Sequence, residues 1–288
     1  IGRLWGQVPG YERVHVCRRT NYTISLFTTL RDRTTGTAAY VQASSKLAEL
    51  LLNEALALLP FAPTSVVTPV DEATYLGMTM PDPETELCVV SILRAADSIA
   101  EVAMRMLPGV AVGKMLIQRD EETARAKLTY TKFPTDIAAR KGARARALHV
   151  TARTENRRVI GIVAEVLLVD PMLATGGSLV QAVGALREAG VPEQAIVIAS
   201  LVAAPEGIEQ VSASTSDPHH IEFACLSSNA PPLAERVWSQ VTKAHPMVRI
   251  VVGEVDRGLN ARKYIVPGLG DMGDRYYNTS HTQAQRAT

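Results

Sequence analysis

The residues of this chain that are best suited to chemistry lie in one continuous run, Val169-Asp170-Pro171-Met172-Leu173-Ala174-Thr175-Gly176-Gly177-Ser178. Apolar residues 166–169 end at this run and an apolar-periodic stretch, 179–189, follows it, which predicts a buried strand, a tight loop and a helix that begins near Ser178. Glycines let the backbone approach a ligand, and the free N–H groups at a helix N-terminus bind anions. The run therefore predicts a phosphate site, with hydroxyl donors from Thr175 and Ser178.

The residue types in this loop indicate which kind of phosphate compound it binds. The P-loop of nucleotide hydrolases requires a lysine before its final Ser or Thr, and Gly177 stands at that place, which argues against ATP hydrolysis. Asp170 ends the strand, where its carboxylate can accept two ribose hydroxyls while the turn binds the phosphate of the same sugar. These features predict a ribose 5-phosphate site. A glycine-rich turn without a ligand is the structural alternative.

Residues 170–178 resemble the phosphoribosyl pyrophosphate (PRPP) loop of the type I phosphoribosyltransferases, and residues 171–174 within it resemble the uracil phosphoribosyltransferases in particular. The resemblance continues in blocks from about Leu26 to Tyr277. The most specific block reads Tyr-Ile-Val-Pro-Gly-Leu-Gly-Asp-Met-Gly-Asp-Arg, from Tyr264 to Arg275. The other blocks are residues 91–95, 113–123, 202–208 and 256–260.

Two arginines follow apolar, strand-like runs and have the chemistry that pyrophosphate requires. The planar guanidinium group makes bidentate, charge-assisted bonds and stays charged at any relevant pH. The resemblance implies that Arg94 and Arg119 hold the pyrophosphate of PRPP, and the structural alternative is that they pair with nearby acids at 120–122. The implied PRPP-binding residues are Arg94, Arg119, Asp170, Met172, Leu173, Ala174, Thr175, Gly176, Gly177 and Ser178.

One position departs from the family pattern in the pyrophosphate loop. The family carries a glycine after Arg-Ala, where the backbone approaches the pyrophosphate, whereas this chain has Ala96 followed by Asp97. We expect Ala96 to restrict the loop and Asp97 to repel the leaving group. This departure keeps open the alternative of a non-catalytic, regulatory relative.

The C-terminal block predicts a rigid loop that presents backbone groups. Its glycines at 268, 270 and 273 match a dinucleotide fingerprint, but Pro267 precedes them and only 15 residues follow, so no βαβ unit fits. Fixed N–H and C=O groups can match the acceptor, donor and acceptor edge of uracil, whereas cytosine would leave buried groups unpaired. By resemblance, the uracil-binding residues are Tyr264, Ile265, Gly270, Asp271 and Met272.

The reaction that the resemblance implies is displacement at the anomeric carbon of PRPP by N1 of uracil, which gives UMP and pyrophosphate. Catalysis then rests on positioning and on charge stabilisation of the leaving group, with Arg94, Arg119 and Asp271 as catalytic candidates. Mg²⁺ fits because it prefers phosphate oxygens and water, and Asp170 or Asp256 is a candidate to touch it. Asp256 has an equal alternative, in which it caps a turn and pairs with Arg257.

Composition and charge exclude several classes of protein. A net charge of +1 argues against a dedicated nucleic-acid binder. The three cysteines have no metal-site spacing and fit a reducing compartment. No apolar run reaches the ~18 residues that a membrane-spanning helix needs, so we expect no membrane partner and a cytoplasmic location. The family resemblance implies that the chain forms a homodimer or homotetramer. It also implies GTP as a possible ligand, because GTP is an allosteric activator of some members.

The order of the predicted elements gives an α/β fold. Apolar strands at 87–93, 110–117, 166–169 and 195–202 alternate with helices at 98–106 and 179–189, and another helix is predicted at 38–59. This alternation predicts a mainly parallel sheet covered on both faces, with ligands beyond the carboxyl ends of its strands.

We expect a single type I phosphoribosyltransferase domain over 1–288, with its core at about 85–256 and a hood over the base site from about 1–84 and 257–288. Two insertions interrupt the family pattern. Residues 138–158 are rich in basic side chains and are read as solvated surface, although they weakly favour a third reading, an RNA-binding regulator of pyrimidine genes. Residues 214–242 are expected to add a strand and a helix outside the site.

Overall fold

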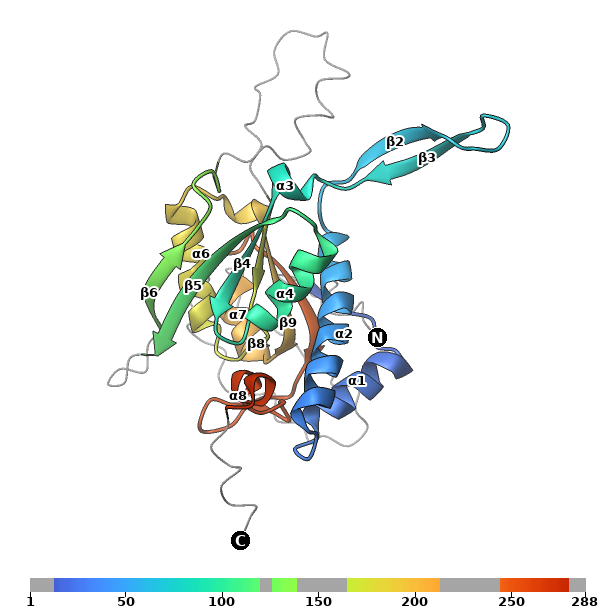
Figure 1. Cartoon of the computed structure of the whole chain (residues 1–288). Coiled ribbons are helices and arrows are strands. Elements are labelled where there is room, and N and C mark those ends of the chain that lie inside the picture. Colours follow the sequence, from blue (N-terminus) through green and yellow to red (C-terminus); the bar gives the residue numbers. More distant parts are fainter. Residues whose placement is uncertain (1–12, 120–125, 139–164, 213–243, 280–288) are drawn as a thin grey trace, which may run out of the picture.

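The computed structural model describes residues 13–119, 126–138, 165–212 and 244–279 (Figure 1). Within these residues the chain forms an eight-stranded sheet in which β1, β10, β9, β7, β4, β5 and β6 are neighbours in that order, and β8 also pairs with β9. All of these pairs are parallel except β5 with β6. The strands are β1 (Val14–Val16), β4 (Leu87–Leu93), β5 (Ala111–Arg119), β6 (Ala126–Lys132), β7 (Glu165–Val169), β8 (Met172–Leu173), β9 (Ile196–Ala203) and β10 (Arg249–Val255).

Helices cover both faces of the sheet, because the side chains of its buried strands alternate between two apolar cores. In β4, Leu87 and Val89 belong to one core, while Cys88 and Val90 belong to the other. The first core packs against α1 (Asn21–Arg31), α2 (Thr37–Leu56) and α4 (Asp97–Met106). The second packs against α6 (Gly177–Glu188) and α7 (Pro205–Ser212), so the parallel α/β class expected from the sequence is confirmed.

The predicted strands and helices of the core are confirmed with small shifts at their ends. The strand at 87–93 is β4, and the strand at 166–169 is β7, which begins one residue earlier. The helix predicted at 38–59 is α2, which runs from 37 to 56. The basic insertion beyond residue 138 and the expected strand and helix at 214–242 lie outside the described residues.

A two-stranded hairpin projects from the body of the molecule (Figure 1). It consists of β2 (Ala62–Val67) and β3 (Thr74–Thr79), which pair with each other and with no other strand among the described residues. Its apolar side chains are exposed by 48–73% and comprise Val66, Val67, Val70, Tyr75, Leu76 and Met78. An apolar surface of this kind marks an interaction site more often than a solvated surface. The hairpin was not anticipated from the sequence.

Short elements connect and complete the core. They are α3 (Pro83–Glu86), η2 (Glu193–Ala195), β11 (Gly258–Leu259), β12 (Ile265–Val266) and α8 (Met272–Tyr277). The hairpin of β11 and β12 and helix α8 form the C-terminal block near the ends of the α1 and α2 helices (Figure 1). None of the described helices is both long and apolar enough to cross a membrane.

Candidate active site

Three charged residues predicted from the sequence follow the carboxyl ends of parallel strands. Arg94 follows β4, Asp170 follows β7 and Asp256 follows β10. Strands β4 and β7 are direct neighbours, with Ser91 opposite Val169 in the register. The carboxyl ends of parallel strands meet at one edge of a sheet, which is where ligands bind in this class of fold.

The phosphate loop has the geometry that its sequence predicts. Gly176 adopts φ +78°, in the left-handed region that favours glycine, and immediately precedes α6, which begins one residue before the predicted start. Gly176 at the N-cap of α6 offers no side chain, and no described side chain caps this helix, so its first N–H groups are available to a ligand. Thr175 and Ser178 are partly exposed beside them. This arrangement can bind a phosphate dianion.

Backbone hydrogen bonds fix the first part of the loop, residues 171–173, to strand β9 and the residue that follows it. The Val202 N–H donates to Pro171 O at 3.1 Å, and the Ala204 N–H donates to Leu173 O at 2.8 Å. The Leu173 side chain is 1% exposed and lies in the core, so any contact of this residue with PRPP is made by its backbone. Gly207 of α7 lies so close behind the loop that a Cβ there would stand 2.5 Å from Ala174 O.

Asp170 is a partly buried carboxyl group that receives few hydrogen bonds. Among the described residues it accepts only one hydrogen bond, a 3.4 Å contact from the Met172 N–H. Burial raises the pKa of Asp170 to about 7, and the Met172 contact offsets this only in part. A carboxyl group in this state gains from ligand hydroxyls or from a hydrated cation, so its environment fits both of the roles predicted for it.

Arg94 connects the end of β4 with helix α8 of the C-terminal block. Its side chain is 54% exposed, and Nη2 donates to Asp274 Oδ1 at 2.7 Å while Nη1 donates to Thr279 at 3.2 Å. Its guanidinium also lies 5.7 Å from the centre of the Tyr277 ring. Arg94 therefore pairs with an acid of α8, and the acids at 120–122 lie outside the described residues. Arg119 ends β5, and its side chain lies outside the described part as well.

The departure at Ala96 and Asp97 is accommodated locally. Ala96 has φ −67° and ψ −17°, an ordinary right-handed conformation, and its methyl group is fully buried in the core. The Asp97 carboxylate accepts from Ser91 Oγ at 2.8 Å and from Lys114 Nζ at 2.8 Å. The expected restriction therefore has no basis in the backbone conformation, and the charge expected to repel pyrophosphate is offset by the Lys114 ammonium group.

The predicted uracil residues lie along the segment from Tyr264, directly before β12, to Met272, the first residue of α8. Ile265 and Met272 are 5% and 1% exposed, whereas Tyr264 is 59% exposed. Gly270 has φ +79°, and its peptide groups have no hydrogen-bond partner among the described residues. Asp271 precedes α8 and accepts from the Asp274 N–H at 2.9 Å, so one carboxylate oxygen caps this helix.

The structure brings part of the predicted catalytic set together. A Cβ at Gly273 would stand 3.1 Å from Arg94 Nη2 and 3.4 Å from Asp271 Oδ1, so both side chains flank this glycine. The residue types alone do not reveal this proximity, because Arg94 belongs to the pyrophosphate motif and Asp271 to the base loop.

Asp256 is engaged by a residue that the sequence analysis missed. Its two carboxylate oxygens lie 2.7 and 2.9 Å from the guanidinium nitrogens of Arg31, at the end of α1. The alternative pairing of Asp256 with Arg257 is therefore wrong. The Arg31 contact leaves Asp256 less suited than Asp170 to touch a cation. No pattern around Arg31 marks it, because its partner lies 225 positions away.

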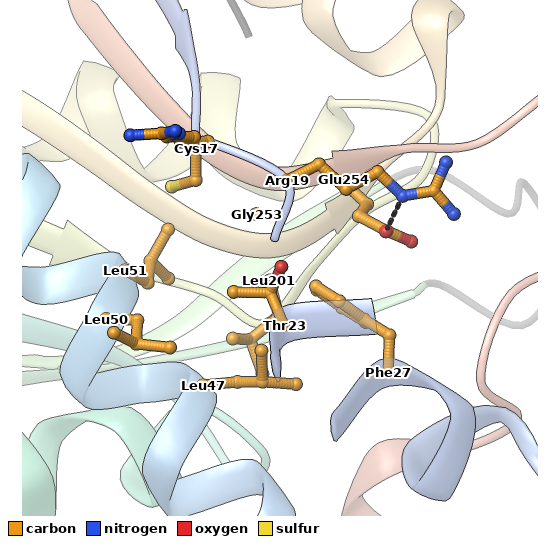
Figure 2. A pocket seen from close by; sticks show the side chains of 11 residues that line it. Cys17, Arg19, Thr23, Phe27, Leu47, Leu50, Leu51, Leu201, Gly253 and Glu254 are labelled. Atoms are coloured by element: carbon orange, nitrogen blue, oxygen red, sulfur yellow. Dashed lines mark ion pairs between the residues drawn. The ribbon is translucent and has the colours of Figure 1, made fainter. Parts of the chain in front are cut away.

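A small cavity lies between α1, α2 and the strands β9 and β10 (Figure 2). Its volume is about 20 Å³, which is room for a water molecule and not for a pyrimidine. The lining is mainly apolar, with Phe27, Leu47 and Leu51 facing Leu201, and the pair of Arg19 and Glu254 lies at its rim.

A phosphate loop, an arginine and a base loop at the carboxyl edge of a parallel sheet define the class of type I phosphoribosyltransferases. A sequence profile described as Uracil phosphoribosyltransferase matches residues 17–279. Uracil phosphoribosyltransferase of Dictyostelium discoideum is 37% identical over 268 residues, which cover 93% of this chain and 97% of that protein. Uracil phosphoribosyltransferase 2 of Schizosaccharomyces pombe is 35% identical over 269 residues, which cover 93% and 96%.

One solved structure has a fold similar to this chain over nearly its whole length. The AQ2163 protein from Aquifex aeolicus is 25% identical to this chain, with a TM-score of 0.63. The match covers 93% of this chain and 99% of that one. The chain belongs to the uracil phosphoribosyltransferase family.

Proposed function

We propose that the chain transfers the 5-phosphoribosyl group of PRPP to N1 of uracil, giving UMP and pyrophosphate in pyrimidine salvage. The observation that carries this proposal is the meeting of two sites at one edge of the sheet. The N-terminus of α6 and Asp170 form a ribose-phosphate site. Arg94, which follows the neighbouring strand β4, reaches Asp274 of α8, and α8 begins directly after the base loop. A sugar phosphate and a base can therefore meet there.

PRPP would occupy the loop and the two arginines. The 5-phosphate takes the N–H groups of α6 with the hydroxyls of Thr175 and Ser178, and Asp170 accepts the ribose hydroxyls. Arg94 and Arg119 hold the pyrophosphate, whose developing charge they stabilise as the C–O bond breaks. Arg94 would exchange its Asp274 partner for the pyrophosphate, which carries more negative charge.

Mg²⁺ is proposed to arrive with PRPP. When bound, it neutralises pyrophosphate oxygens and makes pyrophosphate a better leaving group. The poorly satisfied Asp170 carboxyl fits such a cation or its water shell, whereas Asp256 already has a cationic partner. Within the described residues, no cluster of three or more His, Cys, Asp or Glu side chains is arranged to hold a metal.

Uracil would lie on the loop that precedes α8. Backbone groups of Ile265 and Gly270 read its polar edge, and Tyr264 and Met272 border the ring. Asp271 accepts the N1 proton as the bond to the anomeric carbon forms, or orients the ring, through the carboxylate oxygen that does not cap α8. Specificity against cytosine follows from the fixed polarity of backbone donors and acceptors.

The test of this proposal is the formation of UMP from labelled uracil, PRPP and Mg²⁺. We expect UMP and an equal amount of pyrophosphate, and cytosine in place of uracil should give no product. Uracil binding without UMP would overturn the proposal and favour the non-catalytic relative. RNA binding that persists at moderate salt, with no UMP formed, would favour the RNA-binding regulator.

We also propose a homodimer or homotetramer, with the hairpin of β2 and β3 as part of the contact between subunits. The exposed apolar side chains of this hairpin support an interface with another copy. The variant Leu76→Asp should shift the sedimentation equilibrium toward monomer. Tyr22→Ser, which removes an exposed aromatic ring on α1, is the control and should leave the assembly unchanged.

Three expectations follow from the sequence and the family and complete the proposal. GTP acts as an allosteric activator, a cytoplasmic location suits a salvage enzyme, and the N- and C-terminal segments form one domain with the core as a hood over the base. Titrating GTP into the UMP assay tests the first of these. A rise in rate at fixed substrate concentrations supports it, and an unchanged rate contradicts it.

A further inference from the structure

Arg31 makes a dense set of contacts beside the base loop. At the end of α1, its Nη1 donates to Asp256 Oδ2 at 2.9 Å and to Gly268 O at 2.7 Å. Its Nη2 donates to Asp256 Oδ1 at 2.7 Å and to Glu254 Oε2 at 2.9 Å. The side chains of Arg31 and Asp256 are only 18% and 5% exposed, so this bidentate pair is shielded from solvent.

Asp256 also binds the backbone of Gly268, whose carbonyl Arg31 holds. Its Oδ2 accepts the Gly268 N–H at 2.8 Å, while Arg31 holds the Gly268 carbonyl. Both backbone groups of Gly268 are therefore fixed by one ion pair. Gly268 lies between Ile265 and Gly270, the two residues whose backbone groups are proposed to read uracil.

The loop conformation at this point admits no other residue. Gly268 has φ +62°, and a Cβ there would stand 2.3 Å from Ile265 O. The next carbonyl, that of Leu269, accepts from Arg275 Nη1 at 2.7 Å, and Arg275 also bonds to the carbonyl of Leu30. Arg31 of α1 and Arg275 of α8 thus hold two successive carbonyls of the loop, directly before Gly270.

We propose that Arg31 and Asp256 are positioning residues for base recognition. Their buried pair holds Gly268 so that the adjoining backbone presents its donors and acceptors in the uracil-specific order. This inference rests on the proposed function. Misplacement of a binding group by about 1 Å weakens catalysis strongly, so a loosened pair should impair the use of uracil and its discrimination from cytosine. The use of PRPP should change little, because its loop has separate supports.

Conservative variants separate this role from general stability. Arg31→Lys keeps the charge and loses the planar fork, and Asp256→Asn keeps the shape and loses the charge. The matched control is Arg249→Lys. Arg249 begins β10, at the opposite end of the strand that Asp256 follows, and it pairs there with Glu165. The side chains of Arg249 and Glu165 are 17% and 13% exposed, so the control also loosens a largely buried pair.

The experiment measures KM for uracil, KM for PRPP, kcat and melting temperature for all four proteins. We expect KM for uracil to rise about tenfold or more in Arg31→Lys and in Asp256→Asn, with KM for PRPP within about twofold of the wild type. Arg249→Lys should lower the melting temperature and leave both KM values unchanged.

The inference is overturned if both KM values rise together, or if Arg249→Lys changes KM for uracil as much as Arg31→Lys does. Should Arg31→Lys not fold, Asp256→Asn decides alone, because it alters the same contact from the other side. Failure of the wild type to form UMP would contradict the proposed function instead. The two failures are therefore distinguishable.

Discussion

The PRPP loop and the base loop are supported in different ways. The PRPP loop, residues 170–178, is one continuous strand, turn and helix, and its backbone bonds to the neighbouring strand β9. The base loop, by contrast, depends on side chains that are remote in sequence. Arg31 lies 237 positions before the Gly268 carbonyl that it holds. Arg275 holds the Leu269 carbonyl from nearby in the sequence, but it is fixed in turn to the Leu30 carbonyl of α1, 245 positions before it. One half of the site is thus encoded locally, and the other half exists only in the folded chain.

Asp170→Asn should give the largest difference between the use of PRPP and the binding of uracil. The change removes the charge that we propose accepts two ribose hydroxyls, at a cost of about 3 kcal/mol, so kcat/KM for PRPP should fall about 100-fold. Uracil binding, measured by titration calorimetry, should stay nearly unchanged. Equal losses for both substrates would mean that the ribose is not placed at Asp170.

Gly207→Ala should disturb the PRPP loop from behind. The added Cβ would stand 2.5 Å from Ala174 O, so the loop or α7 must move. We expect a loss of about 1 to 3 kcal/mol of stability and a raised KM for PRPP, with KM for uracil unaffected. The control is Gly184→Ala in α6, where a Cβ meets nothing within 4 Å and helix propensity favours alanine. A raised KM for PRPP in the control would contradict the account.

The pKa of Asp170 predicts how the ligand-free chain responds to pH. The carboxyl titrates near 3.9 in an unfolded chain and near 7 in the native structure, where burial opposes its charge. Between these values the native state holds a proton that the unfolded state lacks. Stability from this group is therefore greatest below about pH 4 and falls as the pH rises to about 7.

Thermal unfolding of the wild type and of Asp170→Asn between pH 4 and 7 checks this sign. The melting temperature of the variant minus that of the wild type should increase with pH, because asparagine has no charge to bury. A difference that stays constant across this range would show that Asp170 ionises normally in the ligand-free chain.

Tyr40→Phe is the smallest change and concerns the supports of the base loop. The Tyr40 hydroxyl is buried without a hydrogen-bond partner among the described residues, while its ring stacks on Arg275 at 4.2 Å. Phenylalanine keeps the ring and removes the unsatisfied group, so we expect a gain of about 1 kcal/mol in unfolding free energy. Both KM values should remain those of the wild type, and a raised KM for uracil would give the hydroxyl a role in the loop.

This contrast also explains what the sequence could predict. The run around Asp170 places a strand, a turn and a helix next to one another, so local patterns were sufficient to locate them within a residue or two. Arg94 was found because it ends an apolar strand. The same reasoning could not find Arg31, because a charge that pairs across more than 200 positions leaves no local periodicity.

Asp97 is a residue for which the sequence predicted an effect that its neighbours in the fold remove. Its position in the motif led to the prediction that its charge repels pyrophosphate. Sequence spacing does not reveal which side chains lie beside it in space. In the fold, β5 places Lys114 beside it and β4 supplies the Ser91 hydroxyl. The departure that favoured a non-catalytic relative therefore loses its physical basis.

A double-mutant cycle between Asp170→Asn and Arg31→Lys tests most directly whether the two halves are supported separately. The quantity measured is the rate of UMP formation at low concentrations of both substrates, in the wild type, each single variant and the double variant. Independent supports predict that the two losses add within about 0.5 kcal/mol, so that the double variant is about 1,000-fold slower than the wild type. A double variant no slower than Asp170→Asn alone would contradict the account.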